Sequence, residues 1–137
     1  MKKAIYISIK PQFTKLIETK EKNYEFRKYI PKEEIDTLFV YESSPTSALK
    51  YIIKLDEIIE YPTKILEPGY GNEDFNNGLK KSKYAYKIKQ VYMLEKPIKL
   101  EVLKQKHGFS APQSYAYCNR YQKLTDDLLK VNLIELV

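Results

Sequence analysis

Three charged residues of complementary chemistry lie within six positions of one another in the stretch KEKNYEFRK. They are Lys22, Glu25 and Arg27, and bulky aromatic residues separate them. In an extended chain, side chains two positions apart point to the same face, so Glu25 and Arg27 should project together, away from the aromatic rings. A planar guanidinium held by a carboxylate is suited to a phosphate or to the edge of a nucleobase.

Lys22 lies three positions before Glu25, so a regular strand would place it on the opposite face. It joins the other two charges only if the chain bends before Asn23. A lysine can then act as a base or nucleophile, provided that burial and a neighbouring cation lower its pKa toward neutrality. Spacing alone leaves two interpretations open, a solvated face of a strand and a site for a ligand.

The composition gives little support to other kinds of catalytic site. His107 and Cys118 are the single residues of their types, so the sequence offers no His/Cys set for a metal and no Ser-His-Asp or Cys-His arrangement. No acidic spacing suggests a carboxylate metal site. The phosphate-binding patterns GxxxxGK[ST] and GxGxxG do not occur in the sequence. We therefore expect neither a metal nor a cofactor.

Length and charge restrict the class of protein. The 137 residues suffice for one domain, residues 1–137, with a sizeable core. The net charge of +6 favours polyanionic partners such as RNA, although charge alone is not specific. No apolar run approaches the roughly 20 residues of a membrane span, and the alternating start MKKAIYISIK is unlike a signal peptide. We expect a cytoplasmic protein that does not contact a membrane. The sequence does not determine its oligomeric state.

Strands and short helices follow one another irregularly along the chain. Residues 4–10 alternate between apolar and polar side chains, which predicts a half-buried strand with its isoleucines inward. Pro11 suits the first turn of a helix that extends to Thr19. Residues 49–61 fit a helix and a strand equally well. Further strands are predicted at residues 23–30, 37–43 and 84–94. This mixture indicates an α+β fold with a largely antiparallel sheet or small barrel.

The second half of the chain carries three further signals for helices. Asn72 is predicted to cap a short helix that contains Phe75 and Leu79. Another short helix should end at Gly108, because glycine readily adopts the left-handed conformation that closes a helix. The tail begins with a cap-like Thr-Asp-Asp at Thr125 and then becomes apolar.

Several polar residues outside the charged stretch are candidates for binding. Lys10 shares the polar face of the first strand, where it either adds charge to a site or is merely solvated. Ser43 and Ser44 precede a proline in a turn whose amides and hydroxyls could bind an anion, although serines also form ordinary turns. Gln113 and Ser114 either cap the final helix or line a cleft.

Three phrases occur in an order that resembles the ASCH domain family: ISIKPQFTKLIETKEKNYEFRK, VYESSP and GFSAPQSYAY. The family signature is G-x-K-x-x-E-x-R after the first helix, and Lys22, Glu25 and Arg27 match its K, E and R. Lys20 stands where the signature has glycine. If that glycine supplies a positive φ, Lys20 has to adopt it, with a strain of about 1 kcal/mol. The resemblance covers most of the chain.

The resemblance implies both a fold and a function. ASCH domains have a barrel related to the PUA domain of RNA-modifying proteins. We therefore expect a small PUA-like, mixed or antiparallel β-barrel flanked by short helices, with residues 49–61 as a strand. We expect RNA or a modified nucleoside to bind in a basic cleft. The protein would then act in RNA metabolism or in the regulation of translation or transcription. The residues expected to bind it are Lys10, Lys22, Glu25, Arg27, Ser43, Ser44, Gln113 and Ser114.

The resemblance also leaves two alternatives open. Some ASCH-like proteins are metal-independent amidohydrolases that remove acetyl groups from N4-acetylcytidine, and ribonuclease activity occurs in the family as well. In such an enzyme Lys22 would be the base or nucleophile, Glu25 would handle protons, and Arg27 would stabilise an oxyanion or phosphate. The small amidohydrolases have a threonine where this chain has Glu25. The other alternative is a protein-interaction adaptor, because the family takes its name from a domain of a transcription coactivator.

Overall fold

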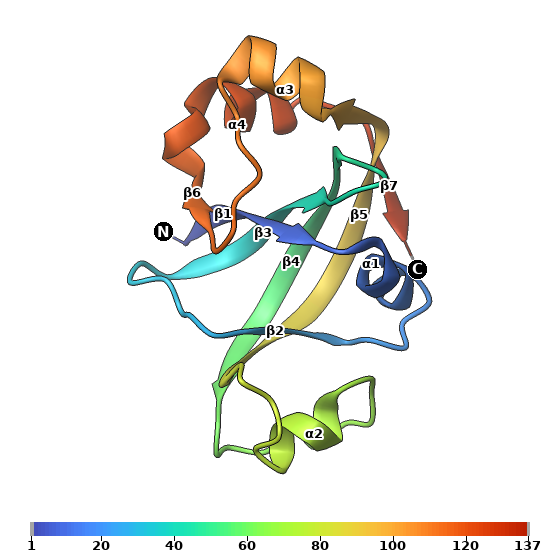
Figure 1. Cartoon of the computed structure of the whole chain (residues 1–137), viewed down its shortest axis with the longest axis vertical. Coiled ribbons are helices and arrows are strands. Elements are labelled where there is room, and N and C mark those ends of the chain that lie inside the picture. Colours follow the sequence, from blue (N-terminus) through green and yellow to red (C-terminus); the bar gives the residue numbers. More distant parts are fainter. Residues whose placement is uncertain (1, 137) are drawn as a thin grey trace.

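A seven-stranded mixed sheet, curled into a half-barrel, forms the centre of the molecule (Figure 1). The computed structural model describes residues 2–136. The strands are β1 (Lys3–Ile9), β2 (Tyr24–Arg27), β3 (Ile35–Glu42), β4 (Ala48–Glu60), β5 (Tyr84–Lys99), β6 (Ala116–Tyr117) and β7 (Leu133–Leu136). The helices are α1 (Pro11–Glu18), α2 (Asn72–Asn76), α3 (Leu100–His107) and α4 (Gln122–Leu128), with a 3-10 turn, η1 (Cys118–Tyr121), before α4.

These elements confirm the predicted α+β class, with a barrel-like sheet and short helices. Residues 49–61, which fitted a helix and a strand equally well, lie almost entirely in β4, as the family resemblance implied. None of the helices within residues 2–136 is long and apolar enough to cross a membrane. That residues 1–137 form a single domain stays a prediction.

The long strand β5 organises the sheet. The strands follow the order β2-β5-β4-β3-β1-β6, and β7 also pairs with β5. Only β1 and β3 are parallel among the paired strands of residues 2–136. β2 pairs with residues 84–87 of β5, and β7 pairs with residues 91–94. Because β4 occupies the other edge of β5, β2 and β7 lie one after the other along the same edge and leave residues 88–90 between them.

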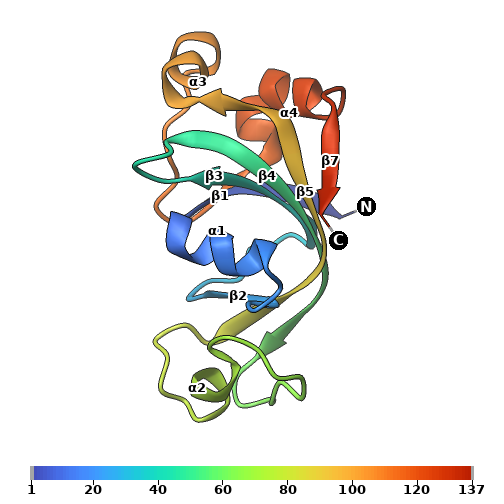
Figure 2. The ribbon, with the colours of Figure 1, turned by 90° about the vertical axis from the view of Figure 1, so that its right-hand side faces the viewer.

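Both faces of the sheet are buried. One face packs its isoleucines against Ile17 of α1, which lies within the curl of the sheet (Figure 2). On the other face, Tyr6 packs against Phe109 and Leu124 from the C-terminal part of the chain. The prediction of a half-buried first strand was therefore wrong for Tyr6, which is 0% exposed. Its hydroxyl is hydrogen-bonded to the hydroxyl of Thr125, at 2.8 Å.

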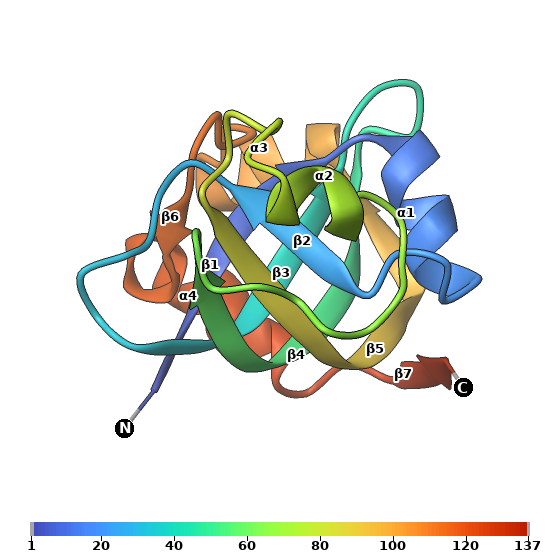
Figure 3. The same ribbon diagram turned by 90° about the horizontal axis from the view of Figure 1, so that it is seen from below.

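Residues 61–83, which include α2, cover the outer side of β2 (Figure 3). Tyr24 is fully buried against Phe75 in this layer, and the ring of Phe26 stacks on the ring of Phe75 at a centroid distance of 5.6 Å. Gly69 lies so close to the start of β2 that a Cβ there would be 2.3 Å from Asn23 Oδ1. A side chain at this position would push the covering segment away from the strand.

Two helix predictions are confirmed by the backbone. α1 begins at Pro11 and ends against Thr19, its C-cap. α3 ends at Gly108, which has a φ of 60°. In this left-handed conformation the amide of Gly108 donates to the carbonyl of Lys104, at 3.0 Å.

The predicted caps at Asn72 and Thr125 were wrong. Gly71 is the N-cap of α2, whereas the Asn72 side chain is buried and donates to Asn23 Oδ1 at 3.0 Å. Leu79 lies beyond α2 and is exposed. Thr125 lies inside α4, and the apolar tail that follows forms β7. In both cases tertiary contacts engage the polar side chain, so it does not serve as a local cap.

Candidate functional site

Lys22, Glu25 and Arg27 meet at the inner side of β2. Arg27 donates to Glu25 Oε2 through Nε at 2.9 Å, and its Nη2 lies 2.8 Å from the same oxygen. Lys22 Nζ lies 3.4 Å from Glu25 Oε1. The side chains of Lys22 and Glu25 are only 6% and 8% exposed, and that of Arg27 is 18% exposed. The solvated-face interpretation therefore does not apply to this group.

Lys22 reaches Glu25 because the chain bends before β2 begins. Lys20 has a φ of 67° and directly follows the cap of α1. The amide of Lys22 then donates back to the carbonyl of Leu16 at 3.0 Å, so it is still tied to the end of the helix. This bend confirms both the condition set for Lys22 and the positive φ expected at Lys20.

Arg27 connects two strands that are not neighbours in the sheet. Its Nη2 donates to the carbonyl of Ser8 in β1 at 2.7 Å. Since β2 and β1 lie near opposite ends of the strand order, this bond spans the open side of the half-barrel. Two of the three guanidinium nitrogens are thus engaged within the protein. Arg27 is placed to hold Glu25 in position, which leaves little of its fork for a ligand.

The amine of Lys22 is surrounded by aromatic rings and cations. It donates to the carbonyl of Tyr24 at 2.7 Å and lies 4.5 Å from the ring centre of Phe26. Burial lowers the pKa of Lys22 below its usual range, and the nearby charges of Lys80 and Arg27 lower it further, while Glu25 acts in the opposite direction. A buried lysine with a lowered pKa is suited to accept a proton.

A hollow of about 230 Å³ opens beside these charges, and we call it the ion-pair hollow. It is lined by three aromatic residues, two lysines, one carboxylate and one serine: Phe13, Phe26, Tyr70, Lys22, Lys80, Glu25 and Ser82. Lys80 Nζ lies 4.6 Å from the ring centre of Phe26, and the rings of Phe13 and Tyr70 meet edge to face at 6.1 Å. Cationic and aromatic surfaces therefore adjoin in one small space.

The sequence analysis missed the residues that residues 61–83 contribute to this hollow. Tyr70, Lys80 and Ser82 lie far from Lys22 in the chain and reach it because the covering segment packs on β2. One local signal pointed to a specific conformation there, the pair of glycines in the loop EPGYGN. Gly71 has a φ of 80°, and a Cβ on it would lie 2.9 Å from the ring of Phe26.

The other predicted binding residues lie outside the lining of the ion-pair hollow. Lys10 is exposed at the N-cap of α1. The amide of Ser43 donates to the carbonyl of Ile9 at 3.0 Å, so it is engaged within the protein, and Ser44 is exposed. Gln113 is exposed and lines a separate hollow, and Ser114 is half-buried in the same loop. The structure thus brings together the signature residues and none of these five.

Comparison with known proteins supports the fold. No protein-family model matches the chain, and no curated protein matches it. Among solved structures, the ASCH protein of Zymomonas mobilis superimposes with a TM-score of 0.65 and 24% identity, over 90% of this chain and 94% of that one. Two mutants of ZmASCH from the same organism give TM-scores of 0.63 and 0.65 at 23% identity, over 91% of this chain and 96% and 98% of theirs. The predicted architecture is thereby confirmed: this chain has the fold of an ASCH domain.

Proposed function

We propose that the chain binds RNA or a modified nucleoside in the ion-pair hollow. The observation that carries the proposal is the buried amine of Lys22, held against Glu25 and facing a hollow that also contains Lys80 and aromatic rings. Burying a lysine and a carboxylate costs free energy, and a core of apolar residues would avoid that cost. Such a group at a concave surface is typical of a functional site.

Each part of the hollow matches one part of a nucleotide. The two lysine amines attract a phosphate, and the rings of Phe13 and Tyr70 offer apolar surface to a base. Glu25 can accept a hydrogen bond from an exocyclic amine, since Arg27 fixes its carboxylate. The net charge of +6 would assist the approach of a polyanion.

Binding measured over a range of salt concentrations tests this proposal. We expect a fluorescently labelled single-stranded RNA to bind with an affinity that falls steeply as salt rises, because each phosphate contact releases counterions. Lys22→Ala should weaken binding, whereas Lys123→Ala, at an exposed position of α4, should change it little. Equal binding by wild type and Lys22→Ala, or an affinity that ignores salt, would refute the proposal.

A second candidate function is hydrolysis of a modified nucleoside or of RNA. The lowered pKa of Lys22 favours it, because a neutral amine can take a proton from an attacking water or from a ribose hydroxyl. Glu25 would handle the proton, and Arg27 would act by holding Glu25. Incubation with N4-acetylcytidine should release cytidine and acetate from wild type but not from Lys22→Ala. Equal rates with both proteins would remove Lys22 from the reaction.

A further inference from the structure

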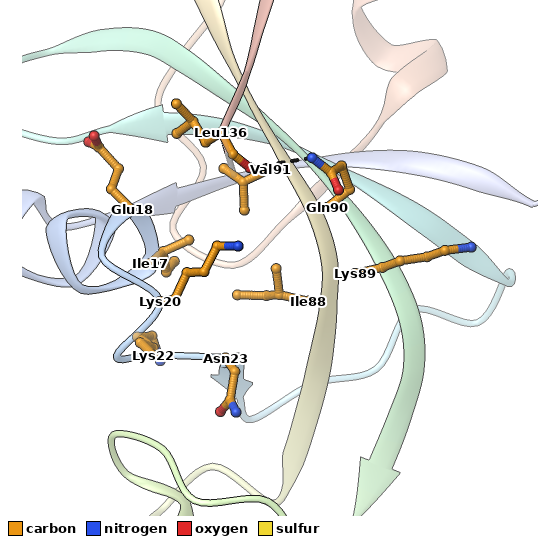
Figure 4. Close-up of a pocket in the computed structure, with 10 residues that line it drawn as sticks. All are labelled: Ile17, Glu18, Lys20, Lys22, Asn23, Ile88, Lys89, Gln90, Val91 and Leu136. Atoms are coloured by element: carbon orange, nitrogen blue, oxygen red, sulfur yellow. Dashed lines mark hydrogen bonds between the residues drawn. The ribbon is translucent and has the colours of Figure 1, made fainter.

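A second hollow, of about 210 Å³, also has Lys22 in its lining (Figure 4). It opens where residues 88–90 of β5 lie between β2 and β7 on the sheet edge. Its floor is apolar and consists of Ile17, Ile88, Val91 and Leu136. We call it the Lys20 hollow. Lys22 is in the lining of both hollows, so the two adjoin the same side chain.

The amine of Lys20 reaches over the apolar floor of this hollow (Figure 4). The backbone of Lys20 is left-handed, with a φ of 67°. None of the ion pairs formed within residues 2–136 includes Lys20. The carboxylate of Glu18, also in the lining, turns away and accepts a hydrogen bond from Tyr51. Within residues 2–136, a strained, exposed lysine therefore presents its charge to a hollow whose lining directs no carboxylate into it.

From this arrangement we propose that the ligand is a single strand of RNA at least two nucleotides long, with consecutive nucleotides in the two hollows. Lys20 contacts the phosphate that joins them or the next one along the strand, and the apolar floor accepts the second base. This inference rests on the proposed function of the ion-pair hollow, and it selects an oligonucleotide over a free nucleoside.

The physical chemistry of the Lys20 hollow fits a nucleotide better than a purely apolar ligand. Bases stack or pack on apolar surface with little regard to sequence, and a lysine amine supplies a flexible positive charge for phosphate. On this edge residues 88–90 of β5 pair with neither β2 nor β7, and the amide of Ile88 donates to the carbonyl of Asn23 at 3.0 Å. A free nucleoside would use only one of the two hollows.

The test compares ligands of increasing length on a matched set of variants. Affinities are measured by calorimetry for cytidine, cytidylyl-cytidine and an oligocytidylate, and for the adenosine series in parallel, so that a base preference does not hide binding. The variants are Lys20→Gly, which removes the amine and the strain together, Lys20→Arg, which keeps the charge, and Lys123→Ala. Lys123 is exposed on α4 and lies outside the lining of both hollows, so its loss removes one charge without touching either and is the control.

We expect wild type to bind the dinucleotide more tightly than the nucleoside. Lys20→Gly should weaken dinucleotide binding about fivefold, lower the salt slope for the oligonucleotide by about one, and leave nucleoside binding unchanged. The melting temperature of Lys20→Gly should rise, so its weaker binding would not result from a loss of folded structure. Lys20→Arg should retain the dinucleotide affinity, and Lys123→Ala should behave as wild type.

Two results would overturn the inference while leaving the proposed function in place. One is a dinucleotide advantage that persists in Lys20→Gly, and the other is an equal loss in Lys123→Ala. If wild type binds none of the nucleosides or oligonucleotides, the proposed function itself fails and this inference fails with it.

Discussion

Two buried carboxylates lie beside α1, and their partners differ in kind. Glu42, at the end of β3, is 4% exposed and accepts hydrogen bonds from the hydroxyls of Thr14 and Thr46. Lys50 Nζ is 3.7 Å from it. Glu25, on β2, is 6% exposed and lies between Lys22 and Arg27.

The difference shows which carboxylate is suited to a ligand. Both oxygens of Glu42 accept from neutral hydroxyls, one on α1 and one in the turn between β3 and β4, so the group completes local structure. The group around Glu25 has two cations for one carboxylate and opens into the ion-pair hollow. Hydrogen bonds from hydroxyls satisfy the buried carboxylate of Glu42 without a second buried charge at hydrogen-bond distance. The group of Lys22, Glu25 and Arg27 instead buries two cations with one carboxylate, and an anionic ligand in the hollow can balance the excess positive charge.

The largest expected effect is on stability, from Glu25→Gln. The change leaves Lys22 and Arg27 buried without their carboxylate, so the free energy of unfolding should fall by about 3–5 kcal/mol. Glu42→Gln should cost only about 1 kcal/mol, because an amide can still accept and donate hydrogen bonds with the two threonine hydroxyls. Urea denaturation of both variants measures the two values. Equal losses would mean that the two carboxylates contribute equally to the free energy of unfolding, contrary to the comparison.

Next in size is the effect of Lys22→Met on binding. The loss of the amine should lower affinity for single-stranded RNA at least about tenfold. The free energy of unfolding should change by about 1 kcal/mol or less, because methionine fills the same space and avoids the desolvation of a charge. Lys50→Met, beside Glu42, is the matched control and should leave binding unaltered. A large loss of stability with unaltered binding would assign Lys22 a structural role.

The pH dependence of stability should separate wild type from Lys22→Met. Burial lowers the pKa of Lys22 in the folded protein below its ordinary value of 10.5. The folded state thus penalises the protonated amine, and this penalty is present in full below the folded pKa. It disappears as pH rises through the folded pKa toward 10.5. Wild type should gain stability relative to Lys22→Met over that window, as denaturation between about pH 7 and pH 11 would reveal. A constant difference would contradict a lowered pKa.

The smallest expected effect concerns the backbone at Lys20. Lys20→Gly should raise the free energy of unfolding by about 0.5 kcal/mol, because glycine adopts a φ of 67° without the Cβ penalty. Lys20→Ala keeps the Cβ and should give no gain. Thermal denaturation of the two variants measures the difference. A loss of stability in Lys20→Gly would show that the lysine side chain packs more strongly than its exposure suggests.

The sequence predicted local geometry well where the pattern itself determines it. Alternation placed Glu25 and Arg27 on one face of β2, and the family signature placed a positive φ at Lys20. Gly108 ended α3 because few other residues adopt a left-handed cap cheaply. In each case one or two residues are enough to specify the backbone.

The same reasoning failed where distant segments decide the outcome. Tyr6 was placed on a polar face because its neighbours alternate, yet the C-terminal part of the chain buries it. Asn72 looked like a cap, and its side chain instead joins the covering segment to Asn23. Tyr70 and Lys80 were not foreseen as lining residues, since nothing within their own stretch of sequence indicates that they pack over β2.

The bond from Arg27 to the carbonyl of Ser8 has a consequence for how the molecule is made. β2 has its sheet partner in β5, so the strand that carries Glu25 and Arg27 cannot be fixed until Tyr84–Lys87 has been synthesised. Contacts of such long sequence separation form late in folding. On a ribosome, where the N-terminal part emerges first, β1 must therefore wait for its link to β2. A nascent chain arrested before Tyr84 should therefore lack the bond from Arg27 to the carbonyl of Ser8.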